Sequence, residues 1–133
     1  MRNMMFIRAC YYIGAAADLL ATLPLLFPDV AGAMFGLSGF SAANEYLYAS
    51  RIGASLMLGW TFLLLWGSRK PVERRGVLFI TILPVLAGLL ISSILAVTTG
   101  FIEIQFMVPL WIFYALMIPA YAVAYVTAGS MKE

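Results

Sequence analysis

The stretch GVLFITILPVLAGLLISSILAVTT, residues 76–99, decides the fold class of this chain. It contains no Asp, Glu, Lys, Arg or His, and it exceeds the roughly 20 apolar residues that a helix needs to cross the hydrocarbon core of a membrane. Because lipid offers the backbone no hydrogen-bond partner, such a segment crosses the bilayer as a helix. We therefore predict a transmembrane helix over residues 76–99.

Three further segments on either side of this stretch have the same character, and we predict transmembrane helices over residues 5–27, 44–67 and 105–128. The first is ended by Pro28-Asp29, because the residue before a proline is disfavoured in helical geometry. The second ends at Gly67-Ser68. The predicted fold is all-α: a single domain, residues 1–133, forming an integral membrane bundle of four antiparallel transmembrane helices.

The composition agrees with lipid as the main solvent. Of the 133 residues, 64% are hydrophobic and 11% are charged, whereas soluble domains are about a quarter charged. The net charge of +2, from eight Lys and Arg against six Asp and Glu, is too weak to predict a nucleic-acid partner. One cysteine and no histidine exclude an intrachain disulfide and histidine-ligated metal or haem sites, so we expect neither a metal nor a cofactor.

The positions of the cations predict the orientation, since short cytoplasmic loops of membrane proteins carry the excess of Lys and Arg. The loop SRKPVERRG holds four cations, and three more lie near the ends of the chain: Arg69, Lys70, Arg74 and Arg75, then Arg2, Arg8 and Lys132. The opposite connections, residues 28–43 and 100–106, hold none. We predict a multi-pass protein of the bacterial cytoplasmic membrane with both termini in the cytoplasm. Residues 29–43 should lie at the outer membrane surface, with one short helix opened by Asp29. A re-entrant turn formed by the same residues is the alternative.

Two ionisable residues fall inside the predicted spans, Asp18 in the first and Arg51 in the second. A charge at the bilayer centre costs about 2.5–3.5 kcal/mol on insertion scales. At about 1.5 Å per residue, Asp18 lies roughly 14 Å from Phe27, and Arg51 lies roughly 9–12 Å from the start of its helix. We therefore expect the two side chains to meet in the outer half of the membrane.

Two interpretations of this pair remain open. It is either a static ion pair that fixes the register of the two helices, or part of a binding site for a small or lipid-like molecule. Helical spacing places other polar side chains on the same stripes of the two helices. The candidate ligand-binding residues are Asp18, Arg51, Tyr11, Thr22, Tyr48 and Ser55.

The third and fourth spans carry weaker signals. Pro84 and Pro119 lie inside them and remove backbone hydrogen bonds, so each is either a hinge or a tolerated proline. Tyr114, Tyr121 and Tyr125 recur at helical spacing in the fourth span. They form either an aromatic wall for an apolar ligand or ordinary core and interfacial contacts.

The runs ADLLATLPLLFPDVAGAMFGL and YLYASRIGASLMLGWTFLLLWGSRKPVERRGVL resemble small bacterial four-helix membrane proteins of unassigned function, which are similar to DoxX-like proteins in size and layout. The resemblance extends through the third span, and the RKPVERRG turn is its most distinctive part. It implies a four-helix bundle in the bacterial cytoplasmic membrane. It implies no activity and no catalytic residue.

Three functions fit these observations. The first is a non-enzymatic membrane protein that binds a small hydrophobic or amphipathic molecule near Asp18 and Arg51, or serves as an accessory subunit. The second is a small proton-coupled exporter working as a dimer, against which Arg51 argues because a neighbouring cation competes with a cationic substrate. The third is an enzyme acting on a lipid or isoprenoid, for which the chain offers few general acids. We expect membrane lipids as partners, together with self-association or a partner membrane protein.

Overall fold

The computed structural model describes residues 1–131, and within them four segments are long and apolar enough to cross a membrane. The first is helix α1, Arg2–Leu26; the second is α3, Asn44–Arg69; the fourth is α6, Ile104–Ser130. The third span, Gly76–Thr98, consists of α4 (Gly76–Ile80), η1 (Thr81–Leu86) and α5 (Ala87–Thr98). The predicted all-α bundle of four membrane-spanning segments is confirmed. The largest difference at a boundary is the start of α1, predicted at Met5 and observed at Arg2.

The third span is not the continuous helix that its uniform hydropathy predicts. Pro84 has no N–H to donate, and its ring occupies the space of the preceding turn. The helix breaks within Thr81–Leu86, where Leu83 leaves helical geometry with φ −128° and ψ 114°. Pro119 has no such effect, because α6 continues past it to Ser130. Whether the break at Pro84 works as a hinge stays a prediction.

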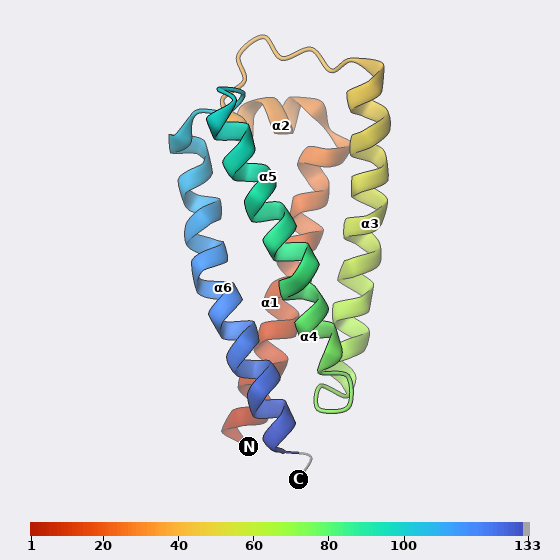
Figure 1. The fold of residues 1–133 in the computed structure, drawn as a ribbon. Coiled ribbons are helices and arrows are strands. Elements are labelled where there is room, and N and C mark those ends of the chain that lie inside the picture. The colour runs from red at the N-terminus through yellow and green to blue at the C-terminus, as the bar shows by residue number, and fades with distance from the viewer. Residues whose placement is uncertain (132–133) are drawn as a thin grey trace.

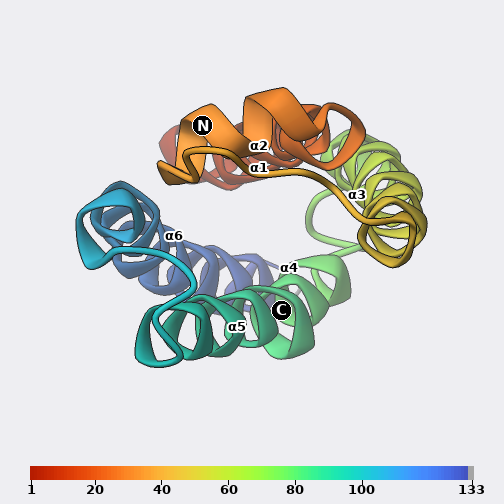
Figure 2. The same ribbon diagram turned by 90° about the horizontal axis from the view of Figure 1, so that it is seen from above.

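The four spans form two antiparallel hairpins, one of α1 and α3 and the other of α4–η1–α5 and α6 (Figure 1). Viewed along the bundle, the hairpins make two layers, with α1 against α3 in one and α5 beside α6 in the other (Figure 2). Contact between the layers runs mainly from α1 to α6, and from α3 to α4 near the connecting loop. Both described ends of the chain and the loop between α3 and α4 therefore lie at one end of the bundle, called here the terminal end (Figure 1).

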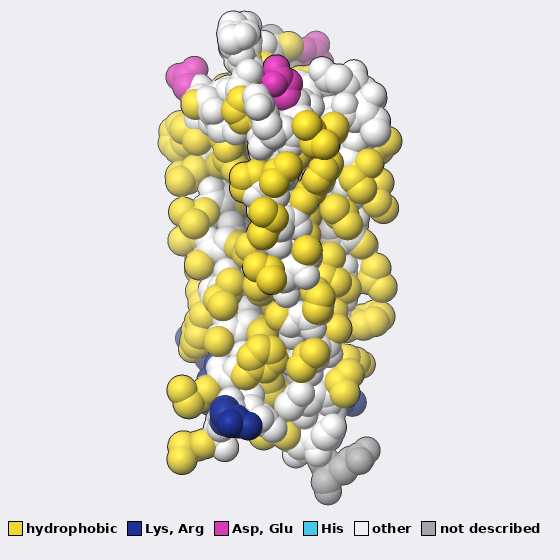
Figure 3. Space-filling view, turned by 90° about the vertical axis from the view of Figure 1, so that its left-hand side faces the viewer, with side chains coloured by type: hydrophobic (Ala, Val, Ile, Leu, Met, Phe, Trp, Pro, Cys, Tyr) yellow, Lys and Arg dark blue, Asp and Glu magenta, His cyan; other side chains and the backbone are white. Residues whose placement is uncertain are grey.

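The surface has the charge distribution of a protein embedded in lipid. Apolar side chains cover the middle of the face in Figure 3, with Lys and Arg below them and Asp and Glu above. Many large hydrophobic side chains are exposed along the spans, such as Leu56 at 69%, Phe62 at 69% and Leu116 at 67%. In water this surface would be unfavourable, whereas acyl chains solvate it well.

A short helix, α2 (Pro28–Phe35), lies across the end opposite the terminal end (Figure 1). Pro28 occupies its first turn, where a missing N–H costs nothing, and Asp29 follows it. The helix ends at Gly36 with φ 66°, a left-handed conformation that favours glycine. A Cβ at Gly36 would also collide with the ring of Phe106, so α2 is seated on the start of α6. The predicted short helix is confirmed, and it begins one residue before Asp29.

The tightest packing lies in the half of the bundle near the terminal end. Within the described part of the chain, the central cluster of buried side chains contains no residue from 16–63. Its members come from the first turns of α1, the last turns of α3 and α6, and the span between them: Ile7, Cys10, Tyr11, Ala15, Leu64, Val77, Leu78, Leu86, Tyr114, Met117, Tyr121, Ala124 and Ala128. Asp18 lies about one helical turn beyond Ala15, the last residue of α1 in this cluster.

Candidate functional site

Within residues 1–131, Asp18 has a buried side-chain oxygen without a hydrogen-bond partner. It lies in α1, about 24 Å from the start of that helix at 1.5 Å per residue, and thus near mid-membrane. Its side chain is half-buried, and its Oδ2 atom is buried without a hydrogen bond. An unsatisfied buried polar atom costs about 1–3 kcal/mol. Such an atom in a membrane span is a candidate for ligand contact.

Two buried tyrosines of α6 interact electrostatically with this carboxyl group. Tyr121 and Tyr114 are 2% and 5% exposed, and both lie within electrostatic range of Asp18. The Tyr121 hydroxyl rests against Gly14, one helical turn from Asp18, where a Cβ would leave it no room. Neither hydroxyl donates a hydrogen bond to another residue within 1–131. We call Asp18, Tyr114 and Tyr121 the carboxyl–tyrosine cluster.

Arg51 does not meet Asp18, so the predicted contact is wrong. The Arg51 side chain is exposed, and the ion pair found in residues 1–131 joins Lys70 to Glu73 instead. The reason is the rotation of α3 about its axis, which turns the small buried residues Ser50 and Ala54 toward α1. Small side chains let helix backbones approach closely in lipid. Arg51, about 100° around the helix from Ser50, is thereby directed outward.

The other predicted ligand residues are not gathered around Asp18 either. Tyr11 is fully buried and donates a hydrogen bond of 3.0 Å to the carbonyl of Arg74. This bond ties α1 to the loop between α3 and α4. Thr22 is 3% exposed and donates to the carbonyl of Asp18 at 3.0 Å, within its own helix. Tyr48 is 71% exposed, and Ser55 lies on the same exposed side of α3. Their binding of a ligand stays a prediction, but they do not form one pocket.

The cluster that the structure does assemble was only partly foreseen. The helical spacing of Tyr114 and Tyr121 marked them as an aromatic face, and Asp18 was marked by its charge. Nothing in the sequence indicated that these two faces meet, because hydropathy carries no information on which helices are neighbours. Tyr125, the third tyrosine of the predicted wall, lies apart from Asp18 and packs against Phe79 with ring centroids 5.8 Å apart.

Two tryptophans donate indole hydrogen bonds that join neighbouring spans. Trp111 of α6 donates to the hydroxyl of Ser93 in α5 at 2.8 Å, within the second hairpin. Trp60 of α3 donates to the hydroxyl of Thr81 at 3.1 Å and so joins the two hairpins. Thr81 in turn donates to the carbonyl of Val77 at 2.7 Å, so its hydroxyl is held in place as an acceptor.

The donor set of the site is oxygen-based and sparse. In the part of the chain that the structure describes, no three His, Cys, Asp or Glu side chains lie together as metal ligands. The cluster offers one carboxyl group and two phenolic hydroxyls, which can accept or donate hydrogen bonds and stack on an apolar or cationic body. Such an arrangement is suited to binding and proton exchange.

Comparison with known protein families, with curated proteins and with solved structures found no match to this chain. The chain has the four long apolar helices of a small four-span membrane protein, and no family is identified for it. The function has to be argued from the site itself.

Proposed function

We propose that this chain is a non-enzymatic membrane protein that binds a small amphipathic molecule between its two hairpins, with Asp18 as the polar anchor. The observation that carries the proposal is the Oδ2 atom of Asp18, buried among membrane helices without a hydrogen-bond partner. Such an arrangement costs stability in the empty protein. A ligand that supplies the missing partner would recover that free energy as affinity.

The residues around Asp18 favour a particular ligand chemistry. A carboxyl group at this depth favours a hydrogen-bond donor or a positive charge. The rings of Tyr114 and Tyr121 are suited to an apolar or cationic body beside that group. We therefore expect a lipophilic amine, a quaternary cation or an amphipathic alcohol as the ligand.

The test compares Asp18→Leu and Asp18→Asn with the matched control Asp29→Asn, which makes the same chemical change at an exposed residue of α2. The probe is the lipophilic cation tetraphenylphosphonium, titrated into detergent-solubilised protein by calorimetry. Because tetraphenylphosphonium has no hydrogen-bond donor, its attraction to the Asp18 carboxylate is coulombic. We expect the Asp18 variants to lose about 10- to 100-fold in affinity, or about 1.4–2.8 kcal/mol. Asp29→Asn should bind like the unmodified protein.

The stability of the same variants separates a binding role from a structural one. Because the Asp18 carboxyl group lacks a partner, Asp18→Leu should raise the free energy of unfolding by about 1–3 kcal/mol. If Asp18→Leu instead lowers stability by a similar amount, the carboxyl group holds the fold together and the binding proposal fails. Equal affinity of all variants for the cation would also reject it.

A second candidate is a small proton-coupled exporter that works as a dimer. It is favoured by the separation of Arg51 from Asp18, since no described cation now competes with a cationic substrate at the carboxyl group. Addition of tetraphenylphosphonium to purified protein should then release protons, to an extent that varies with pH. Cation binding without proton release at any pH would dismiss the exporter while leaving the simpler binding function in place.

The setting of this function is proposed from the charges. We infer a bacterial cytoplasmic membrane with the terminal end in the cytoplasm, because the Lys and Arg residues gather at that end. Self-association, or docking to a larger membrane protein as an accessory subunit, would cover the outward face of α3. There Arg51 and Ser55 lie beside Gly59, at which an added Cβ would meet nothing within 4 Å.

A further inference from the structure

A second polar feature lies at the terminal end, about 15 Å along α1 from Asp18 at 1.5 Å per residue. Here the first turns of α1 and the loop between α3 and α4 enclose a shallow pocket of about 200 Å³. Three cations line it, together with one acid and apolar side chains: Arg8, Arg69 and Lys70, then Glu73, with Met4 and Val72. Three positive charges against one negative charge leave the pocket with a net charge of +2.

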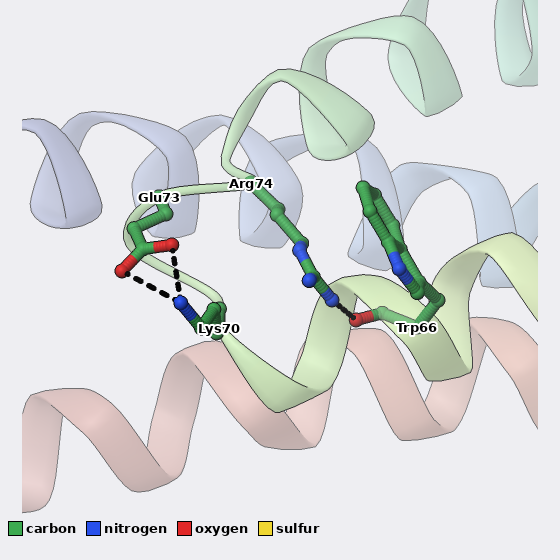
Figure 4. A network of polar contacts seen from close by, with 4 residues as sticks. All are labelled: Trp66, Lys70, Glu73 and Arg74. Carbon is green, nitrogen blue, oxygen red and sulfur yellow. Dashed lines mark hydrogen bonds and ion pairs between the residues drawn. The ribbon is translucent and has the colours of Figure 1, made fainter.

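Two arginines of the loop between α3 and α4 already have interaction partners within the protein. Arg74 donates a hydrogen bond to the carbonyl of Trp66 and stacks over its ring, with 3.6 Å between the guanidinium carbon and the ring centroid (Figure 4). Arg75 lies over the ring of Tyr125 at 5.3 Å. These two arginines fasten the loop to α3 and α6. Their roles are structural, and neither lines the pocket.

The cations of the pocket have weaker engagements. Lys70 pairs with Glu73 at 3.0 Å, but both side chains are more than half exposed, and exposed pairs of this kind contribute little (Figure 4). Within residues 1–131, Arg8 and Arg69 form no ion pair and no side-chain hydrogen bond. Two guanidinium groups, from α1 and α3, thus line the same pocket and are available to bind an anion.

The backbone around the pocket is already ordered. The Tyr11 hydroxyl holds the Arg74 carbonyl at 3.0 Å, the Arg74 amide bonds to the Lys70 carbonyl at 3.0 Å, and Pro71 is buried. A ligand would therefore meet a preformed site and would not bear the cost of ordering the loop.

The height of the pocket in the membrane points to the ligand. Helices α1, α3 and α6 have 25, 26 and 27 residues, or about 38–40 Å at 1.5 Å per residue, against about 30 Å of hydrocarbon. The turns at both ends of these helices thus lie among lipid head groups. One turn from Arg8 toward the membrane interior, Tyr12 is 53% exposed and continues this surface into the apolar band.

We propose that this pocket binds the phosphate of an anionic phospholipid, with Arg8 and Arg69 as its two guanidinium ligands. Guanidinium groups bind phosphate oxygens in bidentate geometry. The volume of about 200 Å³ is below the roughly 300–1,000 Å³ of sites that enclose a whole small molecule. It fits a head group whose acyl chains extend along the outside of α1, and Met4 and Val72 contact the glycerol region.

The test measures the affinity of purified protein for phosphatidylglycerol and for phosphatidylcholine with the same acyl chains, by native mass spectrometry. The variant is Arg8→Gln/Arg69→Gln. The matched control Arg2→Gln removes a cation at the same end of α1, outside the pocket. We expect phosphatidylglycerol to bind at least tenfold more tightly than phosphatidylcholine, and the double variant to lose that preference. Arg2→Gln should keep it within about twofold.

Three outcomes would overturn the proposal. Equal losses per charge in Arg2→Gln and in the double variant would show diffuse attraction without a site. Equal affinity for the two lipids would show that the negative head group is not recognised. Displacement of phosphatidylglycerol by millimolar inorganic phosphate would assign the pocket to free anions. Arg8→Lys/Arg69→Lys, which keeps the charge, separates folding from recognition: it should bind phosphatidylglycerol more tightly than the glutamine variant, and equal loss in both would reject the charge-based site.

Discussion

At the scale of single residues, Gly14 decides how closely α1 and α6 approach beside Asp18. A Cβ there would collide with the hydroxyl of Tyr121, and the next ring atom, Cζ, would lie 3.1 Å away. The absence of a side chain at position 14 is thus what allows the Tyr121 hydroxyl to lie against α1, one helical turn from Asp18. The carboxyl–tyrosine cluster depends on a residue that has no functional group of its own.

We predict that Gly14→Ala lowers the free energy of unfolding by about 1–3 kcal/mol, the usual cost of overpacking a core. Adding Tyr121→Phe removes the colliding hydroxyl and should recover a large part of that loss. Unfolding in detergent followed by circular dichroism measures both effects. The matched control is Gly59→Ala, where a Cβ meets nothing within 4 Å. A double variant as unstable as Gly14→Ala alone would contradict this account of the contact.

At the scale of elements, indole hydrogen bonds connect helices whose surfaces are otherwise apolar. The bond from Trp60 to Thr81 joins the hairpins, whereas the bond from Trp111 to Ser93 lies within one hairpin. Lipid-facing helices gain little from the hydrophobic effect between them, so such polar contacts specify which neighbours pair. Trp60 also contacts the third span beside the break in its helix, since Thr81 is the first residue of η1, which contains Pro84.

We expect Trp60→Phe to cost about 0.6 kcal/mol and at most about 1.7 kcal/mol, the range measured for hydrogen bonds between membrane helices. A double-mutant cycle with Thr81→Val should recover most of that value as coupling energy. The corresponding cycle for Trp111 and Ser93 is the comparison. No coupling between Trp60 and Thr81, beside clear coupling in the second pair, would mean that the hairpins are held together by other contacts.

At the scale of the whole molecule, the two ends of the bundle differ in charge and in structure. The terminal end carries six of the seven described Lys and Arg residues, Arg51 being the exception, and Arg74 and Arg75 among them stack on aromatic rings. The opposite end carries α2 and the exposed acids Asp29, Glu45 and Glu103. Insertion of the chain in one direction would follow from this asymmetry.

The orientation can be tested because Cys10, which is 3% exposed, is the single cysteine. In a Cys10→Ala background, a membrane-impermeant maleimide should label Ser38→Cys in intact bacterial cells and Glu73→Cys only after the membrane is opened. Both positions are exposed, at opposite ends of the bundle. Labelling of Glu73→Cys alone in intact cells would reverse the orientation, and labelling of both would contradict the four-span arrangement.

The sequence by itself determined the class of the protein, the number of spans and nearly all of their ends. Each of these depends on a property summed along the chain: a run of apolar residues either suffices to cross hydrocarbon or does not, whatever its neighbours are. The short helix that begins at Pro28 could also be predicted, because proline and glycine restrict or permit particular conformations of the adjacent backbone.

Only the tertiary structure decided which faces meet. Asp18 and Arg51 were matched in height by counting residues, but Ser50 and Ala54 turn α3 so that Arg51 points outward. Asp18 instead interacts electrostatically with Tyr114 and Tyr121 of α6, from which the sequence separates it by most of its length. In lipid, close packing of small side chains sets the rotation of a helix about its axis. An apolar helix has several faces of nearly equal hydropathy, so its sequence does not show which face packs against a neighbour.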